Sequence, residues 1–219
     1  MTDRPGDPKP SRRRNPGAVF LVVAGGFALL ATLANAILRS IPDAPTNLFG
    51  TVFGLLLASF FLVPLVIVVG FTYLGVGGRG VYPLGGYSVR ARMLFFLTGV
   101  VALAAQYSLI GPALVPVGPD TSLMQAEATT IALESVAIAL AILTSIVVIR
   151  AGVARGFARW ALPVAIVLTA TALIVSNAFS SNWGDIPHGV GIVILGLGYW
   201  RAGVHVAAPV PEAVESLAE

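Results

Sequence analysis

The chain alternates long apolar stretches with short charged ones, and this pattern is its most regular feature. No Asp, Glu, Lys or Arg occurs in residues 15–38, 44–78, 93–119, 135–149, 160–184 and 186–200. A helix needs about 20 apolar residues to cross the hydrocarbon core of a bilayer, and flanking residues extend each stretch to that length or nearly so. The pattern predicts transmembrane helices at residues 17–38, 49–73, 92–115, 128–149, 160–179 and 187–206.

These six spans predict the fold class and the organisation of the chain. Lipid offers no hydrogen-bond partner to a bare backbone, so each span should be helical, and the alternating pattern of barrel strands is absent. We therefore expect an all-α membrane protein, a bundle of six transmembrane helices over residues 17–206. Residues 1–16 are expected to form a disordered basic arm, and residues 207–219 a short acidic tail. An alternative is that the first helix is a signal peptide cleaved near Ala36.

Basic residues lie almost entirely on one side of this predicted ladder of helices. Lys and Arg are retained on the cytoplasmic side of short loops, so their positions indicate the orientation. With six spans, Arg39 alone among the 13 Lys and Arg residues falls on the outer side. The outer connections hold Asp43, Asp120, Glu127 and Asp185 instead. We therefore expect both termini to be cytoplasmic.

Composition agrees with a membrane location and indicates which membrane to expect. Hydrophobic residues make up 57% of the chain and charged residues 11%, with a mean hydropathy of +0.90. These values are far from those of a soluble domain, so the bilayer itself is the expected surrounding. The net charge of +3 is explained by the cytoplasmic flanks of the helices, and we expect no nucleic-acid partner. Nearly all basic residues are Arg, and Ala and Gly are abundant, which is typical of the codon usage of a GC-rich bacterial genome. We therefore expect a bacterial plasma (inner) membrane.

Small residues recur at every fourth position on the first two predicted helices. Ala24, Ala28 and Thr32 form one row, and Gly50, Gly54 and Ala58 form another. Such rows let helix backbones approach closely in lipid. We interpret them as packing surfaces, either between these two helices or toward a second copy or a partner membrane subunit.

Polar residues within the spans gather at one level of the predicted bilayer. If the fourth helix starts near Ala128, Glu134 lies about 9 Å inside its outer end. A bare ionised carboxylate there is costly, so we expect Glu134 to be protonated, paired with a cation or facing a hydrated cavity. The directions of the other spans bring further polar residues to this outer level: Asn35, Arg39, Gln106, Tyr107 and Asn177, with Asp185 and His188 above them. We interpret this set as a candidate ligand or proton site, the alternative being an ion pair between Glu134 and Arg39 among helix-joining polar groups.

Residues that would indicate catalysis or a cofactor are scarce. The chain has no Cys, and its two His, His188 and His205, fall on opposite sides of the predicted bilayer, so we expect no metal site and no haem. Residues 75–80 read GxGxxG, but a dinucleotide site needs a βαβ unit, whereas here a membrane helix precedes the glycines. Ser180 or Ser181 with His188 is the nearest approach to a hydrolase, without the expected glycine-rich turn.

A binding or transport role suits these features best. The six-helix arrangement with both ends inside, and Ala24 and Ala28 on the first span, resembles the substrate-binding subunits of energy-coupling-factor vitamin transporters. This resemblance covers topology and two alanines, includes no diagnostic motif and assigns no family. We expect a multi-pass membrane protein that binds or translocates a small solute or lipid around Glu134. The alternatives are a structural or regulatory subunit and, least favoured, an intramembrane enzyme.

Overall fold

The computed structural model describes residues 14–41, 45–78, 81–108, 121–179, 186–200 and 202. These residues form the helices α1 (Pro16–Ser40), α2 (Thr46–Val76), α3 (Val89–Ser108), α5 (Thr121–Ala151), α6 (Ala158–Phe179) and α7 (Ile186–Tyr199). The β-type pairing within this part of the chain is an isolated bridge between Gly78 and Val81. The predicted all-helical class is confirmed for the described residues.

Each predicted span corresponds to one helix, with differences at the ends. Helix α3 was expected to reach residue 115, but residues 109–120 lie outside the described part. Helix α5 begins at Thr121, well before the predicted residue 128. Helix α7 ends at Tyr199, and Trp200 and Ala202 lie in a turn, whereas the predicted span continued as a helix; residues 201 and 203–206 of that span lie outside the described part. The backbone turns there because the Ala202 N–H bonds to the Tyr199 carbonyl at 3.0 Å and the Trp200 carbonyl is engaged by the start of the chain.

Four helices of the described part are long and apolar enough to cross a membrane. They comprise Pro16–Ser40, Asn47–Val76, Ile131–Ala151 and Ala158–Val175. Helix α7 is apolar but has 14 residues, and α3 carries Arg90 and Arg92 in its first turn. The helices therefore indicate a membrane-embedded protein, in agreement with the composition.

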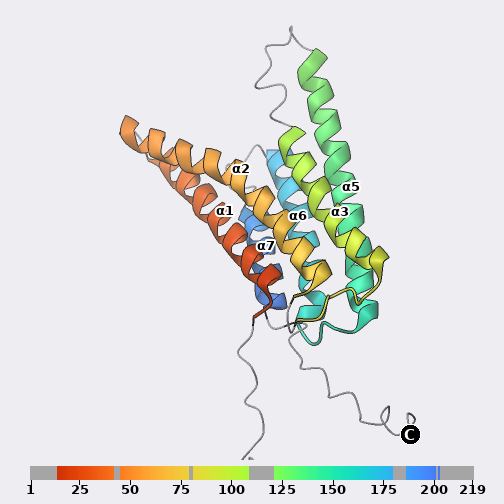
Figure 1. The fold of residues 1–219 in the computed structure, drawn as a ribbon. Coiled ribbons are helices and arrows are strands. Elements are labelled where there is room, and N and C mark those ends of the chain that lie inside the picture. Colours follow the sequence, from red (N-terminus) through yellow and green to blue (C-terminus); the bar gives the residue numbers. More distant parts are fainter. Residues whose placement is uncertain are drawn as a thin grey trace, which may run out of the picture.

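The helices pack in a ring in which each one contacts two neighbours. Helix α1 contacts α2, followed in turn by α3, α5, α6 and α7, which returns to α1. The contact between α5 and α6 is much the smallest in the ring. At one end the hairpin of α1 and α2 leans away from α3 and α5, whereas the helices converge at the other end (Figure 1). We name the end with Asn15 and Tyr199 the closed end, and the end with Arg39 and Phe49 the open end.

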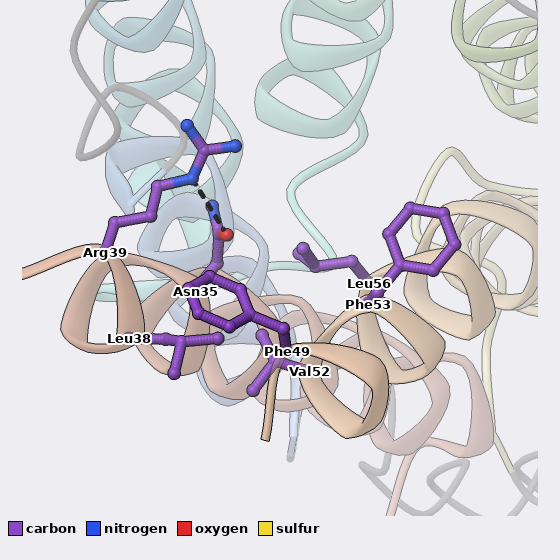
Figure 2. Close-up of a pocket in the computed structure, with 7 residues that line it drawn as sticks. All are labelled: Asn35, Leu38, Arg39, Phe49, Val52, Phe53 and Leu56. Atoms are coloured by element: carbon purple, nitrogen blue, oxygen red, sulfur yellow. Dashed lines mark hydrogen bonds between the residues drawn. The ribbon is translucent and has the colours of Figure 1, made fainter. Parts of the chain in front are cut away.

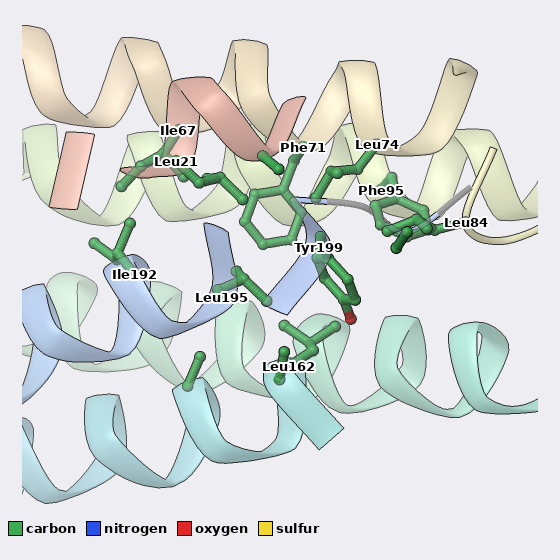
Figure 3. Packing of buried hydrophobic residues seen from close by; sticks show 14 of the residues in the cluster. Leu21, Ile67, Phe71, Leu74, Leu84, Phe95, Leu162, Ile192, Leu195 and Tyr199 are labelled. Atoms are coloured by element: carbon green, nitrogen blue, oxygen red, sulfur yellow. The ribbon is translucent and has the colours of Figure 1, made fainter. Parts of the chain in front are cut away.

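Buried apolar side chains gather at the closed end. In α2, burial begins at Val63 and continues through Phe71 to Leu74, in the half of the helix nearer that end. Tyr199 of α7 is fully buried and lies among core side chains of α2 and α6, including Phe71 and Leu162 (Figure 3). The core therefore ties the helices together at the closed end and leaves the open end less filled.

Helix backbones approach closely at glycines that the sequence analysis had not singled out. A Cβ atom on Gly25 of α1 would lie 2.7 Å from the backbone nitrogen of Val193 in α7. A Cβ on Gly17 would lie 2.6 Å from the carbonyl oxygen of Gly70 in α2. Both distances are shorter than van der Waals contact, so only glycine fits at these two crossings.

The predicted small-residue rows are only partly used inside the molecule. Ala24 is buried in the core, and Ala28 packs against it from a half-buried position. Thr32, the third residue of the row, is also half-buried. Gly50 and Gly54 do not bring α2 against another helix, because a Cβ on either would meet nothing within 4 Å. The hairpin leans away from α3 at this level, so these two glycines, with the half-buried Ala58 one turn on, lie where α2 is thinly covered.

Asn15 joins the beginning of the described chain to its end. Its side-chain oxygen accepts from the Gly17 N–H at 3.0 Å and caps α1, while its amide nitrogen donates to the Ala202 carbonyl at 3.2 Å. Its backbone N–H donates to the Trp200 carbonyl at 3.0 Å. The predicted disordered arm of residues 1–16 is therefore wrong for Asn15 and Pro16, since buried capping outweighs local polarity. Residues 1–13 and the tail from 207 lie outside the described residues.

Candidate functional site

The open end holds a cavity between the last turns of α1 and the first turns of α2. The cavity has a volume of about 330 Å³. Its lining consists of Asn35, Leu38 and Arg39 from α1 and of Phe49, Val52, Phe53 and Leu56 from α2 (Figure 2). Two of the predicted site residues, Asn35 and Arg39, therefore lie together at one cavity.

The polar side of this cavity is a hydrogen-bonded pair on one helix. Asn35 and Arg39 are four residues apart, so they are neighbours on the surface of α1. The Arg39 Nε donates to the Asn35 side-chain oxygen at 3.2 Å, as the dashed line in Figure 2 marks. Arg39 also lies in the last turn of α1, where the negative end of the helix dipole favours a cation. The pair therefore orients a permanent positive charge beside the cavity.

The opposite side of the cavity is apolar and partly aromatic. Phe49, Val52, Phe53 and Leu56 follow the three-and-four spacing that places side chains on one face of a helix. Phe49 is 46% exposed and Phe53 is 66% exposed, large fractions for phenylalanine in the closely packed part of a protein. The lining therefore combines one cation and one amide with a broad apolar wall.

Tyr107 lies on α3 and contacts α2 beside a proline. Its hydroxyl donates to the Phe61 carbonyl at 2.7 Å, and its ring centroid is 6.3 Å from that of Phe60. Pro64 lies inside α2 and has no N–H, so it cannot bond to the carbonyl four residues before it. Tyr107 supplies a donor next to this interruption, so its hydroxyl joins α3 to α2.

Glu134 lies on a different part of the ring from Arg39. Because α5 begins at Thr121, Glu134 is about 20 Å from the start of its helix, near the middle, and not about one and a half turns from the end as the sequence had indicated. The side chain is half-buried. Helices α1 and α5 do not pack on each other, and the end of α1 that carries Arg39 is far from α5 (Figure 1). Arg39 and Glu134 therefore belong neither to one site nor to one ion pair in this structure.

Of the remaining predicted site residues, His188 contacts a neighbouring helix, and the side chains of the others are not described by the structure. His188 is half-buried in the first turn of α7, where its Nδ1 lies 3.1 Å from the Thr169 hydroxyl of α6. This bond joins α6 and α7. Asp185, its predicted neighbour, lies outside the described residues, as do the side chains of Gln106 and Asn177.

The sequence analysis missed the aromatic side of the cavity. Phe49 and Phe53 belong to a predicted span in which almost every residue is apolar, so periodicity could not separate cavity-lining positions from lipid-facing ones. The only available signal was their proximity, across a short connection, to Asn35 and Arg39. Two helices joined by a short connection tend to be antiparallel, which brings these ends together.

The described side chains form no cluster of three or more His, Asp or Glu residues that could hold a metal ion. The lining of the cavity at the open end offers recognition by charge, hydrogen bonding and apolar contact. The sequence matches no protein-family model, and no curated protein and no solved structure is significantly similar to it.

Proposed function

We propose that this chain is a six-span membrane protein, with both termini in the cytoplasm, that binds a small amphiphile with an anionic headgroup. The binding site is the cavity at the open end, between α1 and α2. The observation that carries the proposal is the lining of that cavity, in which the Arg39 guanidinium and the Asn35 amide face an apolar and aromatic wall.

The two sides of the cavity suit the two parts of such a ligand. A guanidinium bonds carboxylates and phosphates through paired N–H groups, and these bonds are stronger than those between neutral groups. Burying an acyl chain against Phe49, Phe53 and Leu56 contributes about 0.8 kcal/mol for each CH₂ group removed from water. A cavity of about 330 Å³ has the volume of a small-molecule site.

The predicted orientation supports a position in the outer leaflet. Apart from Arg39, the basic residues of the described helices and turns lie toward the closed end or in its connections, among them Arg14, Arg90, Arg150 and Arg155. The positive-inside rule assigns that end to the cytoplasm. The open end then faces outward, and a ligand would reach the cavity from the outer surface or from the outer leaflet.

The test is a thermal unfolding titration of the detergent-purified protein with dodecanoate, with dodecanol as the uncharged comparison. Ligand that binds the folded state raises the melting temperature by mass action. Dodecanoate should stabilise the wild type more than dodecanol does. Arg39→Gln should weaken dodecanoate binding roughly tenfold, because one charge-assisted interaction is lost, and should leave the dodecanol response unchanged.

Glu134→Gln serves as the matched control, because Glu134 lies on α5 and away from this cavity. It should leave dodecanoate binding unchanged. If Glu134→Gln abolished binding while Arg39→Gln did not, the site around Glu134 would replace the one proposed here. Equal responses to dodecanoate and dodecanol would contradict recognition of an anion.

A scaffold role is the second candidate, and one observation favours it. The face of α2 that carries Gly50 and Gly54 is open, since a Cβ on either residue would meet nothing within 4 Å. A membrane partner could approach α2 closely along this face. In that case the wild type and Arg39→Gln would respond equally to every amphiphile, and the protein would be recovered with its partner after mild solubilisation.

A further inference from the structure

A second cavity lies at the closed end, on the opposite side of the molecule from Arg39. It has a volume of about 520 Å³ and is formed by the turn between α5 and α6 together with the end of α7. Its lining includes Arg155 and Phe157 from that turn, and Leu197, Gly198 and Trp200 from the end of α7. None of these residues lines the cavity at the open end.

The turn that carries Arg155 has a defined shape. Gly152 and Gly156 flank it with φ values of +67° and +57°, in the left-handed region that other residues rarely adopt. These two glycines let the chain reverse direction between α5 and α6 within a few residues. Arg155 is exposed and lines the cavity, so its cation is presented there.

The wall formed by α7 is held by contacts already described. The Trp200 carbonyl accepts from the Asn15 N–H, and the Arg14 guanidinium lies 4.9 Å from the centre of the Trp200 ring. A Cβ on Gly198 would overlap the Cβ of Ala161, so α6 and α7 touch directly behind the cavity. The indole and the helix pair therefore form a fixed wall.

The charge and polarity of this end complement an anionic headgroup with apolar chains. The charged side chains described at the closed end are arginines, since Glu134 is the single carboxylate among the described side chains and lies near the middle of α5. Phe157 is 60% exposed and Leu197 is 56% exposed, so apolar surface adjoins the cation. Basic pockets between helices on the cytoplasmic side are suited to phosphate headgroups of lipids.

We propose that this cavity binds the phosphate headgroup of an anionic phospholipid. Arg155 pairs with the phosphate, Arg14 adds positive potential across the Trp200 ring, and the first carbons of the acyl chains lie against Phe157 and Leu197. The site is independent of the amphiphile site at the open end. Only its assignment to the cytoplasmic leaflet rests on the orientation given under the proposed function.

The experiment measures lipid retention by native mass spectrometry of the full chain, with phosphatidylglycerol and phosphatidylcholine as probes. The wild type should retain phosphatidylglycerol in preference to phosphatidylcholine. Arg155→Gln should weaken phosphatidylglycerol binding roughly tenfold, as expected for losing one charge-assisted pair. Arg90→Gln is the matched control, because Arg90 is exposed near the same end but on α3, away from the cavity.

Three outcomes would overturn the proposal. Equal losses in Arg155→Gln and Arg90→Gln would show general attraction to a basic surface. Equal retention of both lipids by the wild type would show that charge does not select the ligand. Displacement of the lipid by inorganic phosphate at the same concentration would assign the site to free phosphate. Arg39→Gln should leave phosphatidylglycerol retention unchanged, which separates this test from the one at the open end.

Discussion

At the scale of single residues, the packing of this protein depends on which glycines meet a neighbouring backbone. Gly25 and Gly26 are adjacent on α1, yet only Gly25 faces α7. Their sequence surroundings are almost the same, and a row of alanines runs beside both. Sequence analysis could therefore predict that small residues matter on this helix, but not which of them lies at a crossing, because that depends on how the neighbouring helix is placed.

This pair of glycines gives a direct test. Gly25→Ala should lower the free energy of unfolding by about 1–3 kcal/mol, because the new methyl group would lie 2.7 Å from the Val193 nitrogen and the helices must move apart. Gly26→Ala should be neutral or stabilising by up to about 1 kcal/mol, since its methyl group meets nothing and alanine favours the helix. Thermal unfolding followed by Trp fluorescence measures both, and equal effects would contradict this packing of α1 on α7.

At the scale of helices, the sequence predicted the all-helical class of the described chain. Uncharged stretches specify helices in lipid because the backbone has no other partner, so each of the predicted spans matches a helix of the described chain. The ends were predicted less well. Helix α7 stops at Tyr199 because Asn15, nearly two hundred residues earlier in the chain, bonds to the backbone just beyond it. No local pattern around residue 199 carries that information.

Two threonine hydroxyls meet at the contact between α3 and α5, and together they have too few protons for all the hydrogen bonds within reach. The Thr98 and Thr144 hydroxyl oxygens are 2.9 Å apart, and each is also within hydrogen-bond distance of a carbonyl in its own helix. Each hydroxyl has one proton, so at any moment only two of these three bonds are made. The interhelical bond is therefore expected to contribute little net free energy.

A double-mutant cycle measures this contribution. Thr98→Val and Thr144→Val should each lower the free energy of unfolding by about 0.5–1.5 kcal/mol. Their coupling energy should be near 0.6 kcal/mol, the average for polar pairs between membrane helices. Thr171→Val is the control, because the exposed Thr171 hydroxyl donates to the Val167 carbonyl of its own helix. A coupling energy well above 2 kcal/mol would contradict the proton count.

At the scale of the whole molecule, most of the positive charge lies at the same end as the buried core. The closed end carries the core and the described arginines other than Arg39, whereas the open end is splayed and holds a cavity beside Arg39. The sequence predicted polar residues at one end of the bundle, but it grouped Arg39 with Glu134. Which helices are neighbours cannot be read from spans that are all apolar, and the ring order separates α1 from α5.

The proposed orientation can be tested because the chain has no Cys. Single cysteines at Asn47, at the open end of α2, and at Ser88, beside the closed end of α3, report the two sides of the membrane. In intact cells, a membrane-impermeant maleimide should label Asn47→Cys, whereas Ser88→Cys should react only after permeabilisation. Both positions are exposed, so burial does not limit the reaction. The reverse labelling pattern would place the open end in the cytoplasm.

The bonds of Asn15 also have a consequence for biosynthesis. Asn15 is synthesised before the described helices, but its partners, the carbonyls of Trp200 and Ala202, are synthesised after the last of them. Helix α1 must therefore wait in the translocon or the lipid with this contact unmade until residue 202 has been synthesised. A nascent chain arrested before residue 200 would display an unpaired amide and an unfilled groove along α1, features by which a membrane protease could distinguish an unfinished chain from a finished one.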